Sequence, residues 1–448
     1  MRNGTYPFSC RASRNRLLSG GVPSLFSPPP GVDTLPPGDD DRHPLATTDR
    51  TSTRMALACL GAAALRLLPG DSLSRTPSLS RTPWPSSLTV HVAKGVRLAV
   101  AEAAERDGPA AGIAVAARLT RLIVNELLVY PARMVPFAIR TWRYRAHAAT
   151  LEPVAPELDG VTQAGVSPKT LELYGDGVGD GPLVLFVHGG SWGQGAPWQY
   201  ALLSRRLLDA GASRVGIVQY GLFPAADVDD MVRDVEAALE WGRAQQEAAR
   251  RDGRSLRVVL AAQSAGAHLC SLLQARREAG AWQPDRLVLL SGVFDIAPHF
   301  AHEETRLVHW LSPMWLAMRG RSEPRAAPAR PLVELAGSPL VELEGAWAAA
   351  SPTRLLRLAG PSTQGAEAWP PTVVLHAADD GTVPVSSARE FVEALRGAGG
   401  AVAYREWPTG GHGEIMLSLM GRTPLEDLEP AGLAAISSAF VQEATSLP

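Results

Sequence analysis

The 448-residue chain predicts a doubly wound α/β fold with a mostly parallel sheet. Two observations carry this prediction. After Thr170, short aliphatic runs alternate with helical segments, and the runs are apolar throughout, as in parallel strands that are covered on both faces. Residues 227–245 place apolar side chains at steps of three and four, which is typical of an amphipathic crossover helix. Helices that return the chain between such strands cover both faces of the sheet.

Residues 1–88 predict a low-complexity leader. Before Asp33 the chain is rich in arginine and serine and has no acidic residue, a composition shared by organelle transit peptides and by disordered leaders. Proline-rich sequence with a tandem SLSRTP repeat follows. The apolar stretch 55–68 is shorter than the roughly 20 residues that a membrane span needs. It would suit a signal h-region if Met55 were the true start.

Residues 89–150 predict helices with a basic amphipathic character. Leucines and isoleucines between 119 and 128 share one side, and arginines recur at helical spacing on another. Between 133 and 145, four arginines interleave with aromatic and apolar residues. Two interpretations fit this pattern. The segment 113–145 lies in a membrane interface, or it is a helical arm packed on the main domain.

The main domain is expected over residues 165–445. Its strands are expected at 183–187, 215–220, 256–261, 287–290, 372–376 and 401–407. Residues 297–369 interrupt the rhythm between the fourth and fifth of these strands, which predicts a cap or lid.

Composition and histidine placement exclude several classes of partner. With 43 Lys+Arg against 45 Asp+Glu, nothing in the charge calls for nucleic acid, and a small-molecule or lipid-like substrate is expected. The three cysteines lack metal spacing and predict neither a disulfide framework nor a zinc site. His299, His302 and Glu303 invite a metal interpretation, but a solvated or pocket-lining face suits them better. No metal and no organic cofactor are therefore predicted.

A nucleophile elbow is predicted at Ser264. The aliphatic run before it breaks at a serine flanked by small residues and then reads as a helix. A strained turn of this kind exposes a serine hydroxyl, otherwise a poor nucleophile, to a base. The turn is crowded, so residues two before and two after must be small. Here they are Ala262 and Gly266, with alanine in place of the usual first glycine.

A candidate oxyanion hole precedes the elbow, where the first aliphatic strand ends in HGGSW at 188–192. Consecutive glycines let backbone N–H groups turn toward a ligand, which a side chain would block. Acyl transfer needs such donors for the tetrahedral oxyanion. We expect Gly189, Gly190 and Ser191, with Ala265 after the nucleophile, to supply them.

An acid and a histidine follow the elbow. The strand at 372–376 leads into Asp379 and Asp380, and an acid at a strand end can hold a histidine by accepting its Nδ1–H. His412 stands among glycines after the next strand, on a loop that can reach back to the serine. Ser264, His412 and one of the two adjacent aspartates, Asp379 or Asp380, are therefore the predicted catalytic residues.

These motifs together resemble the isoprenylcysteine α-carbonyl methylesterases, within the carboxylesterase and lipase set of α/β-hydrolases. The strings that carry the resemblance include HGGSW, QSAGAH, HFAH, HAADDGTVP and GGHGE, between about residues 170 and 419. The resemblance implies an α/β-hydrolase fold, with the chain order nucleophile, acid, histidine. It also selects Asp380 as the acid, four residues from both His376 and Pro384.

The resemblance implies a serine carboxylesterase that hydrolyses the methyl ester of a C-terminal prenylcysteine through an acyl-enzyme, at endomembranes. Two other locations are alternatives to endomembranes: the leader directs the chain to an organelle, or the chain is cytoplasmic. Large aromatic residues are expected to line an apolar slot for the prenyl chain or to belong to the core: Trp192, Trp198, Phe300 and Trp315. Kynurenine formamidases, which cleave an N-formyl amide, also share HGGxW and SAGAHL. A generic carboxylesterase and a non-catalytic ligand receptor of the same fold would fit these motifs as well.

Overall fold

The computed structural model describes residues 84–124, 130–153, 170–278, 280–306, 308–319, 340–360, 369–421 and 431–446. All of them belong to the compact unit that spans residues 49–448. The leader expected at 1–88 lies outside the described residues up to position 83, as do 320–339 and 361–368 of the expected cap.

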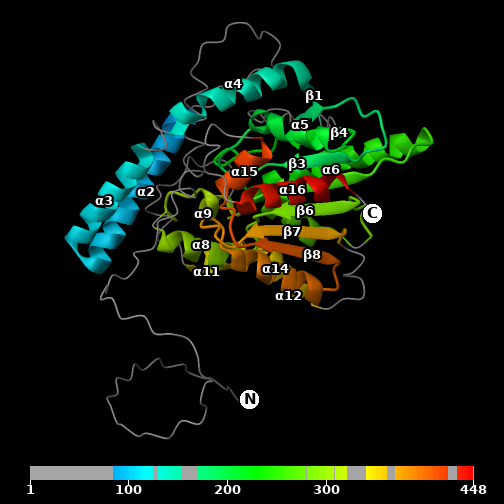
Figure 1. Cartoon of the computed structure of the whole chain (residues 1–448). Helices are drawn as coiled ribbons and strands as arrows, with labels where there is room; N and C mark the ends of the chain where they lie inside the picture. Colours follow the sequence, from blue (N-terminus) through cyan, green and yellow to red (C-terminus); the bar gives the residue numbers. More distant parts are fainter. Residues whose placement is uncertain are drawn as a thin grey trace, which may run out of the picture. The chain divides into compact units, whose positions relative to one another are not determined.

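An eight-stranded sheet forms the centre of this unit (Figure 1). Its order is β1-β2-β4-β3-β5-β6-β7-β8. The six strands from β4 to β8 in this order run parallel, whereas β2 is antiparallel to both of its neighbours. The strands are β1 (Thr150–Pro153), β2 (Thr170–Tyr174), β3 (Leu183–Val187), β4 (Arg214–Val218), β5 (Val258–Gln263), β6 (Arg286–Leu290), β7 (Thr372–Ala377) and β8 (Val402–Trp407).

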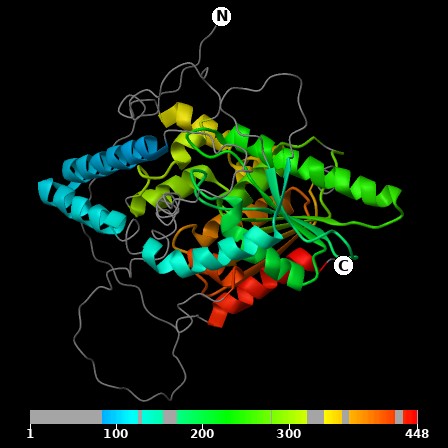
Figure 2. The same ribbon diagram turned by 90° about the horizontal axis from the view of Figure 1, so that it is seen from above.

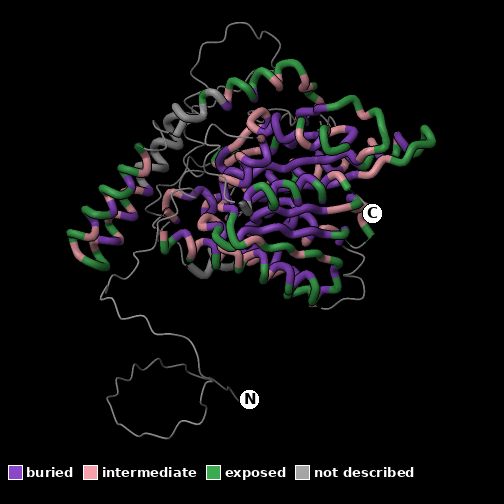
Figure 3. Tube along the Cα trace, in the orientation of Figure 1, coloured by how far each residue is buried: buried purple, intermediate pink, exposed green. Residues whose placement is uncertain are grey.

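The side-chain alternation of the strands builds one core on each face of the sheet. In β3, Leu183, Leu185 and Val187 join one cluster, and Val184 and Phe186 join the other. Helices therefore cover both faces (Figure 2). The strands from β2 to β7 are almost wholly buried, whereas β1 and β8 at the two edges of the sheet are partly exposed (Figure 3). The first layer holds α6 (Val228–Arg251), α7 (Ala265–Arg276), α12 (Pro352–Ala359) and α14 (Val385–Gly397); the second holds α5 (Ala201–Asp209), α15 (Gly413–Leu419) and α16 (Ala431–Thr445). The doubly wound fold predicted from the sequence is confirmed.

The sheet begins upstream of the expected domain start at residue 165. Strand β1 and helix α4 (Tyr130–Ala148) precede that position. The ring of Tyr144 in α4 stacks on Tyr174 in β2 at 5.9 Å, and the guanidinium of Arg145 binds both carboxylate oxygens of Glu172. Phe137 is buried on the same side of α4. This part of the 89–150 segment is thus packed on the sheet's antiparallel edge.

Helices α2 (Trp84–Asp107) and α3 (Pro109–Val124) form a hairpin that touches the cap. A methyl group on Gly95 would lie 2.6 Å from the backbone oxygen of Trp310, so α2 approaches this segment closely. The Glu102 carboxylate accepts the indole N–H of Trp310 at 2.8 Å and lies 3.1 Å from His309 Nε2. Across the described residues, no helix combines the length and apolar character that crossing a bilayer requires.

The cap between β6 and β7 is helical where it is described. It comprises α8 (Ile296–Thr305), α9 (Met314–Ala317), α11 (Leu340–Ala349) and α12. Its aromatic rings contact one another. Phe300 lies 4.9 Å from Trp347 and 6.3 Å from Trp310 between ring centroids, and Trp310 lies 5.5 Å from Trp315. We call Phe300, Trp310, Trp315 and Trp347 the cap aromatic cluster.

Candidate active site

Ser264 occupies the sharp turn between β5 and α7. Its backbone has φ 54° and ψ −122°, a strained conformation for a residue with a side chain. A methyl group on Gly266 would lie 2.2 Å from the carbonyl oxygen of Val187, so only glycine fits there. Ala262, by contrast, is a fully buried strand residue whose side chain joins the core. Alanine at the first small position is therefore compatible with the turn, whereas a side chain at the second is not.

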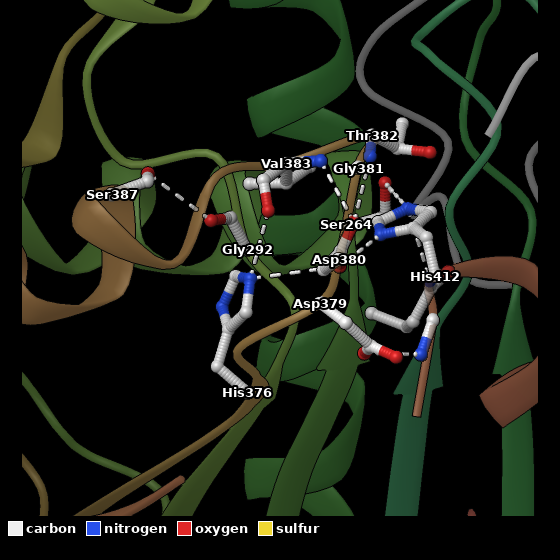
Figure 4. Close-up of polar contacts among 12 residues, drawn as sticks. Ser264, Gly292, His376, Asp379, Asp380, Gly381, Thr382, Val383, Ser387 and His412 are labelled. Atoms are coloured by element: carbon white, nitrogen blue, oxygen red, sulfur yellow. Dashed lines mark hydrogen bonds and ion pairs between the residues drawn. The ribbon is translucent and has the colours of Figure 1, made fainter. Parts of the chain in front are cut away.

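His412 joins Ser264 to Asp380 (Figure 4). Its Nε2 lies 2.9 Å from Ser264 Oγ, and its Nδ1 lies 2.7 Å from Asp380 Oδ2. The three residues follow the carboxyl ends of β5, β7 and β8, the edge where open α/β sheets carry their sites. All three are buried, with exposed fractions of 6% for Ser264, 4% for Asp380 and 1% for His412. The structure thus brings together the three predicted catalytic residues.

The two adjacent aspartates have different surroundings. Oδ1 of Asp380 accepts the backbone N–H groups of Thr382 and Val383, each at 2.9 Å, which leaves Oδ2 directed at His412. Asp379 is exposed, and its Oδ1 accepts the N–H of Gly411 at 2.9 Å. Asp380 is therefore the aspartate that faces the imidazole, and Asp379 tethers the loop before His412.

Asp380 is held as a carboxylate. Burial alone would raise the pKa of this carboxyl, but the charge and hydrogen bond of His412 outweigh it, so the pKa falls below its usual value. His376, four residues earlier in β7, lies with Nε2 at 3.0 Å from the Val383 oxygen and 3.5 Å from Asp380 Oδ2. Burial lowers the pKa of His376, so its neutral ring donates Nε2–H to Val383.

The HGGSW loop lies against the nucleophile. A methyl group on Gly189 would fall 2.9 Å from Ser264 Cβ, so the loop backbone touches the elbow. Gly190, Ser191 and Trp192 have φ angles of 128°, 49° and 57°, three consecutive residues in the left-handed half of conformational space. In the described part of the chain, the N–H groups of Gly189 and Gly190 bind no acceptor. They are thus available to a developing oxyanion, as is that of Ala265 at the first turn of α7.

Two tyrosines support the start of this loop. His188 stacks on Tyr220 at 4.5 Å and on Tyr200 at 5.3 Å, and the Tyr220 hydroxyl donates to the His188 carbonyl at 2.9 Å. Burial lowers the pKa of His188 to about 4, so its ring is neutral. Its Nδ1 lies 2.7 Å from the carbonyl oxygen of Gly189. These contacts make His188 a structural residue of the loop.

The four aromatic residues expected around the substrate occupy different places. Phe300 and Trp315 belong to the cap aromatic cluster, joined through Trp310. Trp192 is buried beneath the elbow, where its indole N–H donates to His268 Nδ1 at 3.0 Å. Trp198 is half-buried in the short helix η3 (Pro197–Tyr200). Trp347 completes the cluster, although no spacing in the sequence connects it to Phe300.

The cap histidines bind separate partners. His302 Nε2 lies 2.9 Å from the Gly381 carbonyl and so contacts the loop of the catalytic acid. His299 lies 3.5 Å from Glu303, and His309 contacts Glu102. Over the described ranges, no group of three His, Cys, Asp or Glu side chains is arranged to hold a metal ion.

Comparison with known proteins places these residues in a family. The sequence profile described as alpha/beta hydrolase fold matches residues 184–416, which include Ser264, Asp380 and His412. An acetyl-hydrolase of Streptomyces hygroscopicus is 32% identical over 235 residues, 51% of this chain and 67% of the relative. A probable isoprenylcysteine alpha-carbonyl methylesterase of Oryza sativa subsp. japonica is 38% identical over 122 residues, 26% of this chain and 28% of the relative.

These relatives are covered to different extents. The chain spans 67% of the acetyl-hydrolase, 28% of the probable methylesterase and 54% of the esterase LipC of Mycobacterium tuberculosis. It is 29% identical to LipC over 249 residues, 53% of this chain. The crystal structure of esterase LipW from Mycobacterium marinum superposes with a TM-score of 0.47 at 18% identity, over 70% of this chain and 87% of that one.

Proposed function

Because the chain belongs to the alpha/beta hydrolase fold family, we propose that Ser264, His412 and Asp380 catalyse the hydrolysis of a carboxylic ester. One observation carries the proposal: a continuous series of hydrogen bonds leads from Ser264 Oγ through both ring nitrogens of His412 to Asp380 Oδ2. The esterase and acetyl-hydrolase names of the relatives agree with this chemistry.

The acylation step follows from this geometry. His412 Nε2 removes the proton of Ser264 Oγ as the oxygen attacks the ester carbonyl carbon. Asp380 stabilises the resulting imidazolium. The negatively charged carbonyl oxygen accepts hydrogen bonds from the backbone N–H groups of Gly190 and Ala265. When the tetrahedral intermediate collapses, the bond to the alcohol oxygen breaks. The alcohol leaves with the proton from His412, and the acyl group stays on Ser264.

Deacylation repeats the same proton transfers with water. His412 takes a proton from a water molecule as its oxygen attacks the acyl-enzyme carbonyl, and it returns that proton to Ser264 Oγ. The carboxylic acid is released and the enzyme is restored. The N–H of Gly189 is available to the same oxyanion, and Ser191 follows these donors in the loop.

The substrate we propose is the methyl ester of a C-terminal prenylcysteine. Two observations support it: a relative named as a probable isoprenylcysteine alpha-carbonyl methylesterase, and the cap aromatic cluster, whose rings suit a long apolar substituent. On this substrate the leaving alcohol is methanol and the product is the free prenylcysteine carboxylate.

The experiment compares two substrates on the purified full chain. A prenylcysteine methyl ester and N-formylkynurenine are hydrolysed separately, each also with Ser264→Ala as the background control. We expect kcat/KM to favour the prenylcysteine ester by at least about a hundredfold, because binding of the apolar chain contributes several kcal/mol. A preference for N-formylkynurenine would replace the proposed substrate with an aryl formamide. Low, similar rates on both would indicate a generic carboxylesterase.

A fluorophosphonate probe tests the chemistry independently of the substrate. Such probes phosphonylate an activated serine, and we expect stoichiometric labelling that Ser264→Ala and His412→Ala abolish. A folded wild-type chain that does not react would instead support a ligand receptor built on this fold.

We also propose that α4 contacts an anionic lipid surface, which would place the enzyme at endomembranes. Val135, Ile139 and Trp142 recur at helical spacing on α4 and are 39%, 46% and 51% exposed. Arg140 and Arg143 are exposed beside them, whereas the opposite side of the helix packs on the sheet edge. Apolar insertion combined with attraction to acidic headgroups supports this orientation.

Vesicle sedimentation tests the lipid contact. The full chain is expected to bind phosphatidylcholine vesicles only when they contain phosphatidylserine, and Ile139→Ser with Trp142→Ser to weaken that binding about tenfold. Leu358→Ser is the matched control, because Leu358 is 79% exposed on α12. Equal binding by all three proteins would leave α4 as a packed arm only.

A further inference from the structure

His268 lies beneath the nucleophile and takes part in none of the steps above. It is one helical turn after Ser264 in α7 and has an exposed fraction of 0%. Its Nδ1 lies 3.0 Å from Trp192 Nε1, and its Nε2 lies 2.7 Å from the carbonyl oxygen of Ala350, where the cap helices α11 and α12 meet. One side chain thus joins the HGGSW loop to the cap.

The two partners determine the protonation state of this ring. An indole nitrogen can only donate, so Nδ1 of His268 accepts and carries no proton. Nε2 therefore carries the proton and donates it to the Ala350 oxygen. Burial lowers the pKa of His268 to about 4, which keeps the ring neutral and both bonds in place at neutral pH.

Trp192 is the residue through which these bonds reach the loop. It directly follows Ser191, and both residues adopt positive φ angles that side chains disfavour. A conformation of this kind persists only where its surroundings impose it. The Trp192 backbone oxygen accepts the N–H of Phe223 at 2.9 Å, and its indole stands edge-on to His268 at 5.3 Å. The backbone bond and the indole bond together hold the strained end of the loop.

We infer that His268 is a positioning residue: through its bond to the Trp192 indole, it sets the backbone of the HGGSW loop that presents the oxyanion donors to Ser264. This inference rests on the proposed acyl-transfer function. It predicts an effect on the chemical step, since a displaced donor weakens stabilisation of the transition state more than binding of the neutral ester. A residue that only fills the core would change stability alone.

Two amide substitutions separate the bonds of His268. In His268→Asn the side-chain oxygen can replace Nδ1, so the bond to Trp192 is retained and the bond to Ala350 is lost. In His268→Gln the amide nitrogen can replace Nε2, so the bond to Ala350 is retained and the bond to Trp192 is lost. Trp192→Phe removes the same bond from the other side.

Steady-state kinetics on p-nitrophenyl butyrate, with active sites counted by fluorophosphonate titration, give the readout. Complete loss of an oxyanion donor typically costs about 10²–10³ in kcat. For a displaced donor we expect kcat to fall about tenfold to a hundredfold in His268→Gln and in Trp192→Phe, with KM changed by less than about twofold. His268→Asn should keep kcat within about threefold of the wild type.

The double variant and a packing control complete the test. If the hydrogen bond between Trp192 and His268 positions the loop, adding Trp192→Phe to His268→Gln lowers kcat no further, because either substitution alone already removes that bond. Cys270→Ala removes another fully buried side chain from α7 and should lower the melting temperature with unchanged kcat. Equal kcat in the Asn and Gln variants, or a loss confined to KM, would overturn the inference. An unlabelled, inactive wild type would instead overturn the proposed function.

Discussion

Asp380→Asn against Asp379→Asn is the sharpest test of the acid assignment. In Asp380→Asn the amide oxygen can stay toward the N–H groups of Thr382 and Val383, because that orientation preserves both 2.9 Å bonds. The amide nitrogen then faces His412 Nδ1, which lies 2.7 Å from the carboxylate in the wild type. A donor at this position stabilises the tautomer that carries its proton on Nε2. That tautomer cannot accept the proton of Ser264.

The wrong tautomer in a serine triad lowers kcat by about 10⁴-fold, equivalent to about 5 kcal/mol in the activation barrier. The amide in Asp379→Asn retains an oxygen for the N–H of Gly411, so this variant should lower kcat less than about threefold. Hydrolysis of p-nitrophenyl butyrate at about pH 7.5 gives both values, and near-ultraviolet circular dichroism checks the fold. Similar losses in the two variants, or a larger loss for Asp379→Asn, would refute the assignment.

Three further predictions concern stability. Ser264→Gly and Ser264→Ala should both be inactive. The free energy of unfolding of the glycine variant should exceed that of the alanine variant by about 1 kcal/mol, because glycine adopts the positive φ of 54° without strain. Equal urea midpoints for the two variants would argue against strain at this position. Burial lowers the pKa of His188 and His268 to about 4, so the unfolded chain binds more protons below about pH 6.5. Unfolding free energy should therefore fall by about 3 kcal/mol per histidine between about pH 7 and 4, and a pH-independent urea midpoint would contradict this. Glu172→Gln, which breaks the part-buried ion pair with Arg145, should lower the free energy of unfolding measured by urea titration by about 2 kcal/mol. Glu406→Gln, which breaks an exposed ion pair with Arg389 of the same 2.6 Å length, should lower it by less than about 1 kcal/mol.

The parallel sheet was predictable because burial on both faces leaves continuous aliphatic runs, as in β3 and β5. Strands β1 and β2 were not predicted. They are short and include polar residues such as Glu172, and the pairing of β2 with β4 joins residues far apart in sequence. The partner of Glu172 is Arg145, a residue that the sequence pattern groups with a basic helix rather than with a strand.

The residues proposed for catalysis could be selected from the sequence because their chemistry requires rare local patterns at strand ends. Their supporting contacts leave no comparable pattern. The bond between Trp192 and His268 joins positions 76 residues apart, and Trp347 meets Phe300 only through the packing of the cap helices. Choosing Asp380 over Asp379 from residues alone was likewise impossible, since adjacent side chains point in different directions once the turn is formed.

The sheet's extension beyond residues 184–416 limits how the protein can be shortened. A fragment cut to the family-matched segment would lack β2 and leave the backbone of β4 unpaired along one edge. It would also lack α16, whose Phe440 packs edge-on against Phe186 at 6.2 Å. An open strand edge next to a bare apolar face favours self-association. Expression of soluble, monomeric fragments therefore requires a start no later than α4 and an end no earlier than α16.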